Sequence, residues 1–169
     1  TAHFSMKKVP LTELDPRLQK QITAADQQLK ANPQYAVEVL TGILVRNPGC
    51  IEVRRTLRKA QKALHGTKKG LFDGITGALT SGKIAKAVEA DPLAAIAAAE
   101  EVLAKKPIDA NANKTIALAA IKLEFHELAA FAYEELCTNE PTEIQHFVDL
   151  ANVWIAAGEN DNALNAADR

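Results

Sequence analysis

Basic side chains at helical spacing are the first feature of this sequence that could do chemistry. Arg54 and Arg58 lie one turn apart in the segment 50–64, so in a helix they share one face. Apolar residues of the segment cover another face: Ile51, Leu57, Ala60 and Leu64. Guanidinium groups placed in this way could bind acidic groups. A solvated basic face is the alternative, and contact with RNA or DNA is disfavoured because no aromatic residues interleave with the basic ones.

A partial phosphate-binding motif lies further along the chain. Residues 77–83 read Gly-Ala-Leu-Thr-Ser-Gly-Lys, which satisfies GxxxxGK. Ile84 stands where a Ser or Thr hydroxyl would hold Mg²⁺, and no strand is predicted before the motif. We therefore interpret this stretch as a Gly-rich connector and predict no nucleotide site in it.

The remaining reactive residue types are dispersed. The histidines form neither HxxxH nor HExxH and stand at His3, His65, His126 and His146. Cys50 and Cys137 fall in different segments, and we expect both to be buried or half-buried. Two carboxylate pairs, 100–101 and 134–135, recur at matching positions and indicate solvated helix faces rather than acid–base catalysis. The sequence thus predicts no catalytic residue, no metal, no cofactor and no small-molecule substrate.

Proline and glycine divide the chain into helix-sized pieces. Asp15-Pro16, Asn32-Pro33 and Asp91-Pro92 each place a capping residue before a proline in the first turn. No segment shows a convincing strand alternation, so the fold class is all-α. The predicted helices cover about 16–31, 32–46, 50–64, 91–106, 109–123, 127–138, 142–157 and 162 to the end.

Three of these segments repeat one another. Residues 95–107, 129–141 and 36–48 align without a gap, and each opens on a small residue and closes on a proline. Pro107 and Pro141 are 34 residues apart. A small residue lets paired helices cross closely, and the proline ends the helix. The pattern is typical of stacked helical repeats.

The sequence here resembles the tetratricopeptide repeat family, which has 34-residue helix–turn–helix units that end in proline. The resemblance covers most of 16–169, and its residues in the last unit are Phe147, Leu150, Ala151, Trp154, Gly158 and Ala163. It implies a right-handed superhelix (an α-solenoid) of antiparallel helix pairs. The spacing from Pro48 to Pro107 is too short for two units, so one second helix is missing or replaced. We divide the chain into a tail (1–15), N-terminal repeat-like helices (16–65), a Gly-rich connector or irregular helix (66–83) and C-terminal repeat-like helices (84–169).

The resemblance also implies a binding surface, because the first helix of each tetratricopeptide unit lines a concave groove. Mapped onto this chain, the groove residues are Arg54, Arg58, Gln61, Asn111, Lys114, Leu118, Val148 and Asn152. A basic residue together with an asparagine could hold a carboxylate of an extended or helical peptide. The full carboxylate-binding pattern of the family is not reproduced, so binding of chaperone tails is not implied.

The charge distribution offers two alternatives to a groove. Residues 1–86 carry a net charge of +9 and residues 87–169 carry −10, so copies of the chain could pair head-to-tail. The segment 68–84 could form a short amphipathic helix at a membrane surface. Its apolar residues are Leu71, Phe72, Ile75 and Leu79. Capping of the flanking repeats is the competing role for this segment.

Composition sets the outer limits of these hypotheses. The chain has 169 residues, of which 47% are hydrophobic and 24% are charged, and its net charge is −1. No apolar run could span a bilayer, and no signal peptide is recognisable. We expect a cytoplasmic piece of a longer chain that acts as a non-catalytic module for binding a protein or peptide, with acidic groups on the partner. A homo-oligomer is the alternative, a membrane role is less favoured, and nucleic acid is disfavoured as a partner.

Overall fold

The computed structural model describes residues 6–67, 81–158 and 166, and every regular element among them is helical. This confirms the all-α prediction. After a short 3₁₀ helix, η1 (Leu11–Glu13), come α1 (Pro16–Gln27), α2 (Pro33–Arg46), α3 (Ile51–His65), α4 (Ser81–Ala90), α5 (Pro92–Leu103), α6 (Ala110–Lys122), α7 (His126–Asn139) and α8 (Ile144–Ala156). No helix in the described part of the chain is long and apolar enough to cross a membrane.

The helix starts follow the predicted capping chemistry. The side chain of Asp15 accepts a hydrogen bond from the Arg17 amide, and the side chain of Asn32 accepts one from the Tyr35 amide. Asp91 caps α5 in the same way by accepting from the Ala94 amide. In all three helices proline follows the cap, where its missing N–H costs no intrahelical bond.

Two boundaries differ from the prediction. α1 ends at Gln27 rather than near residue 31, because the chain turns at Gln28, whose amide is shared between the carbonyls of Ala24 and Ala25. α4 begins at Ser81, inside the stretch 66–83 for which we left a connector or an irregular helix open. The good helix formers after Gly82 outweigh the glycine there.

The apolar residues form two separate cores. The core of the N-terminal helices (α1–α3) includes Leu14, Ile22, Ala25, Ala36, Leu40, Ile43, Val53, Leu57 and Ala60. The core of the C-terminal helices (α4–α8) includes Ile84, Ile96, Leu103, Ile116, Leu128, Phe131, Leu136, Leu150 and Val153. Ile51 of α3 belongs to this second core, so the two groups of helices also share some apolar contact.

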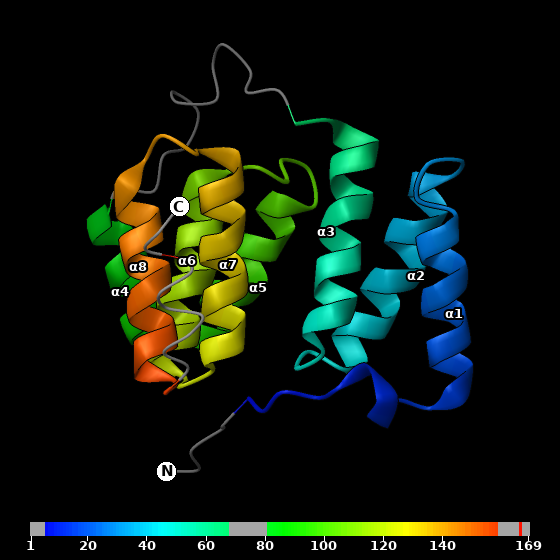
Figure 1. Cartoon of the computed structure of the whole chain (residues 1–169), viewed down its shortest axis with the longest axis horizontal. Coiled ribbons are helices and arrows are strands. Elements are labelled where there is room, and N and C mark those ends of the chain that lie inside the picture. The colour runs from blue at the N-terminus through cyan, green and yellow to red at the C-terminus, as the bar shows by residue number, and fades with distance from the viewer. Residues whose placement is uncertain (1–5, 68–80, 159–165, 167–169) are drawn as a thin grey trace.

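The two groups lie side by side, with α3 facing the C-terminal helices (Figure 1). Within the C-terminal group each helix packs against the next one, and α4 also packs against α6. α1, α2 and α3 pack against one another, and α3 also contacts α7. We call the region where α3 faces α5 and α7 the junction.

An extended segment, residues 6–10, passes the turn between α2 and α3. The amide of Val9 donates a hydrogen bond to the carbonyl of Gly49, at 2.9 Å. A Cβ atom on Gly49 would collide with the carbonyl of Lys7, so this close approach requires glycine. Met6, at the start of the segment, packs against the core of the C-terminal helices.

Candidate functional site

Three of the predicted groove residues lie together at the junction. Arg54, Arg58 and Gln61 project from α3 and are buried, with 3%, 1% and 2% of their surfaces exposed. Spacings of three and four residues place them on one face of α3, as predicted. The sequence did not predict their burial, because charged residues are rarely buried without a partner.

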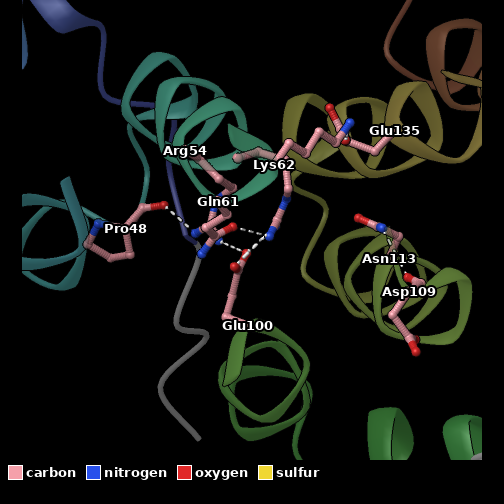
Figure 2. A network of polar contacts seen from close by, with 9 residues as sticks. Pro48, Arg54, Gln61, Lys62, Glu100, Asp109, Asn113 and Glu135 are labelled. Carbon is pink, nitrogen blue, oxygen red and sulfur yellow. Dashed lines mark hydrogen bonds and ion pairs between the residues drawn. The ribbon is translucent and has the colours of Figure 1, made fainter. Parts of the chain in front are cut away.

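The partner of the two arginines is Glu100 of α5. Its Oε1 lies 2.5 Å from Nη1 of Arg54, and both of its carboxylate oxygens lie 3.1 Å from Nη2 of Arg58. Figure 2 shows Glu100 pointing from α5 towards Arg54 and Gln61 of α3. In place of the open groove implied by the resemblance, Arg54 and Arg58 therefore bind a carboxylate of their own chain. We call Arg54, Arg58, Gln61 and Glu100 the Glu100 cluster.

Neutral oxygens satisfy part of the remaining hydrogen-bonding capacity of this cluster. Nη2 of Arg54 donates to the carbonyl of Pro48 at 3.1 Å, and Nη1 of Arg58 donates to Oε1 of Gln61 at 2.7 Å. The Nε atoms of both arginines are buried and have no hydrogen-bond partner in the described structure. Because two guanidinium groups share one carboxylate, the cluster carries one surplus positive charge.

Burial and the neighbouring charges both shift the ionisation of this cluster. Burial raises the pKa of Glu100, but the charges of Arg58 and Arg54 outweigh burial and hold that pKa below its ordinary value. Burial lowers the pKa of Arg54, and the attraction of Glu100 only partly offsets this effect, while Arg58 lowers the pKa further. The carboxylate is therefore strongly held as an anion, whereas the charge of the Arg54 guanidinium group is only partly compensated.

Two further ion pairs connect α3 to α7. Lys62 pairs with Glu135, as Figure 2 shows, and Nη1 of Arg55 lies 2.8 Å from Oε2 of Glu134. The guanidinium group of Arg55 also lies over the ring of Phe131, 5.1 Å from its centroid. The junction is thus a basic helix placed against acidic positions of two neighbouring helices.

The prediction that these carboxylates form solvated faces is wrong for Glu100 and Glu135, because both are largely buried in ion pairs with α3. Glu134 also pairs with α3, but it stays partly exposed. A signal was present in the sequence. Glu100 and Glu134 are 34 residues apart, and the basic residues of α3 recur at four-residue intervals at 54, 58 and 62. The acidic pairs 100–101 and 134–135 on repeated helices could have been matched to one basic helix, in which Arg55 also takes part.

A cavity of about 380 Å³ opens beside the Glu100 cluster, between α2 and α3 on one side and α5 on the other. We call it the junction cavity. Its walls are mostly apolar, and Arg54, Gln61 and Glu100 also line it. The other lining residues are Met6, Thr41, Leu44, Val45, Pro48, Leu57, Leu93, Ile96, Ala97, Glu101 and Ala104.

The other predicted groove residues lie elsewhere. On α6, Asn111, Lys114 and Leu118 are partly exposed, and Leu118 packs against the core of the C-terminal helices. On α8, Val148 is 45% exposed and Asn152 is also exposed. The structure therefore divides the predicted groove, because the α3 residues face α5 whereas these five lie on α6 and α8.

Several sequence predictions concern residues outside the described part of the chain. The amphipathic residues Leu71, Phe72, Ile75 and Leu79 all fall there, as does the first half of the GxxxxGK match. Gly82 and Lys83, which complete that match, lie in the first turn of α4 and are exposed.

Metal and thiol chemistry find little support among the described residues. No group of three or more His, Cys, Asp or Glu residues there could hold a metal ion. Cys50 and Cys137 are buried, which agrees with the expectation from their sequence context. Burial raises the pKa of the Cys50 thiol, which disfavours the reactive thiolate form.

Comparison with models of protein families and with curated proteins finds no match to this chain. Its function therefore has to be inferred from the geometry above.

Proposed function

We propose that the chain is a non-catalytic protein–protein interaction module, built of tetratricopeptide-like helix pairs, that binds a polypeptide partner on the exposed faces of α6 and α8. Support for the repeat comes from the helix starts. α5 and α7 begin at Pro92 and His126, and α6 and α8 begin at Ala110 and Ile144, so both pairs of starts are separated by the 34-residue period. Successive packing from α4 to α8 is the arrangement that stacked helix pairs require.

The observation that carries the binding proposal is an apolar stripe on α8. Ile144, Val148 and Ile155 are 75%, 45% and 58% exposed, and helical spacing places them within one narrow face. Apolar residues gathered on one exposed face indicate an interaction surface. Asn152 lies beside the stripe and could bind the backbone of a partner.

The α6 residues are suited to extend this surface. α6 and α8 both pack against α7, and Lys114 has no ion-pair partner in the described part of the chain. Lys114 and Asn111 could therefore contact an acidic group of the partner. The proposed binding surface therefore includes the predicted residues of α6 and α8. It does not include Arg54, Arg58 and Gln61, which make contacts within the chain.

The alternative of self-assembly through opposite charges has weaker support. It requires basic and acidic residues that are free to pair between copies. Four basic residues of α3 instead pair with Glu100, Glu134 and Glu135 of the same chain. A membrane role rests on residues 68–84, which lie mostly outside the described structure, so no structural observation favours it.

Affinity capture with a matched pair of variants tests the proposal. Val148→Asp places a charge in the α8 stripe, and Val102→Asp places the same charge on α5 at a valine of similar exposure, 40%. We expect the wild-type chain and Val102→Asp to recover the same polypeptide from the native lysate, and Val148→Asp to lose it. Equal recovery by all three proteins would contradict the use of this face.

A further inference from the structure

We propose that the junction cavity binds a free aliphatic monocarboxylate, with its hydrocarbon chain against the apolar walls and its carboxylate towards Arg54. The site is separate from the α8 stripe and does not depend on the function proposed above. The ligand would be bound and not converted.

The size and the walls of the cavity suit a short hydrocarbon chain. Its volume of about 380 Å³ falls within the roughly 300–1,000 Å³ of small-molecule sites. At about 30 Å³ per water-sized group, it accommodates a molecule of about a dozen heavy atoms. Apolar side chains from both sides of the junction contact such a chain, with Leu44 and Leu57 on one side and Leu93 and Ile96 on the other.

The charged residues that line the cavity select the head group. Arg54, of which only 3% is exposed, is one of the residues that line the cavity. The Glu100 cluster carries one positive charge more than it has carboxylates. Buried ions are stable when they are paired, so a ligand carboxylate beside Arg54 makes the cluster neutral. An ammonium head group increases the surplus instead.

Two acidic residues also line the cavity and oppose an anion. Glu100 already accepts hydrogen bonds from both arginines, so its charge is compensated within the cluster. Glu101 is exposed, and water and salt screen its charge. The buried surplus of positive charge therefore determines that the head group of the ligand is negatively charged.

Isothermal titration of the 169-residue chain with sodium octanoate tests the proposal. We expect saturable binding of one octanoate per chain, and binding at least about tenfold weaker for octanamide and for octylammonium, which lack the negative charge. Since each buried methylene contributes about 0.8 kcal/mol, affinity rises about fourfold per carbon from hexanoate to octanoate.

Variants place the ligand in the cavity. Ala97→Trp fills the cavity from an exposed position of α5 and should abolish binding without altering the Glu100 cluster. Arg54→Met removes the surplus charge, so this variant should bind octanoate and octanamide with about equal affinity. Lys114→Met removes a cation from α6 and should leave binding unchanged. Circular dichroism confirms that each variant is folded.

Several results would overturn the proposal. Absence of octanoate binding by the folded wild-type chain does so directly. Equal affinity for octanoate and octanamide shows a merely apolar cavity, and unchanged binding by Ala97→Trp places the ligand elsewhere. Tighter, Ala97→Trp-sensitive binding of a peptide that ends in leucine would assign the cavity to a polypeptide instead. Val148→Asp should bind octanoate like the wild type, so failure here is distinguishable from failure of the proposed function.

Discussion

The contact between α6 and α7 buries apolar side chains, whereas the contact of α3 with α5 and α7 buries charged ones. Ile116 and Leu128 are fully buried in the first contact, and Arg58 and Glu100 meet in the second. The first contact is non-directional and depends on packing. The second depends on geometry, pH and complete pairing of charges. The comparison teaches that each group of helices is held by a core, and that buried charge pairs contribute to joining the two groups beside the apolar contact of Ile51.

The largest effect that distinguishes the two regions should come from Glu100→Gln. This change leaves two buried guanidinium groups without an anion, which should lower the free energy of unfolding by about 3–5 kcal/mol. The matched control is Glu101→Gln, since Glu101 is the exposed neighbour and should have almost no effect. Urea unfolding measures both. Equal effects of the two variants would show that the Glu100 cluster does not support the junction.

Leu128→Ala probes the apolar region. Leu128 is 0% exposed, so its truncation should cost about 2–5 kcal/mol of unfolding free energy through lost burial and a new cavity. The cost should be the same in low salt and in about 1 M salt, because no charge is involved. The free energies of unfolding of the wild type and of Leu128→Ala are measured in urea at both salt concentrations. If their difference depended strongly on salt, the contact between α6 and α7 would not differ from the junction in the way we describe.

The pH dependence of stability should show the contribution of the Glu100 carboxylate, which the apolar contact between α6 and α7 lacks. The folded chain holds the pKa of Glu100 below its ordinary value, so the carboxylate contributes stability above pH 4.5 and loses it as the pH falls through the lowered pKa. The free energy of unfolding should therefore decrease more steeply on the acid side in the wild type than in Glu100→Gln. Superimposable profiles for the two proteins between about pH 3 and pH 7 would refute the shift.

The smallest effect should come from the outer part of the junction. Arg55 is 45% exposed, so Arg55→Met should cost about 1 kcal/mol or less from its ion pair and its contact with Phe131. Part of this cost should disappear in about 1 M salt, because the pair is screened. If Arg55→Met lowered the free energy of unfolding as much as Glu100→Gln, the contribution of an ion pair at the junction would not depend on its burial, contrary to our account.

The sequence predicted most helices because their signals are local. The caps at Asp15, Asn32 and Asp91 depend on adjacent residues, and they fall where the structure has them. The start of α4 at Ser81 was missed because the neighbouring glycines locally favour a turn. The helix formers after Gly82 and packing against α5 and α6 both favour the helix there.

The candidate site was predicted in part. Helical periodicity placed Arg54 and Arg58 on one face, and the resemblance added Gln61. The structure brings the three together, but neither argument could show what that face meets. The partner, Glu100, is far away in sequence, and the link between α3 and α4 carries no signal for how the two groups of helices approach. The junction cavity arises from that approach, so no pattern within one helix could predict it.

A double-mutant cycle between Arg58 and Glu100 tests most directly the claim that buried charges join the two groups of helices. The free energy of unfolding is measured for the wild type, Arg58→Met, Glu100→Gln and the double variant. Leu40→Ala combined with Leu128→Ala, which lie in separate cores, provides a control that should be additive within about 0.5 kcal/mol. The account predicts a coupling energy of about 1–3 kcal/mol between Arg58 and Glu100. Additivity of this pair to the same degree as the control would contradict it.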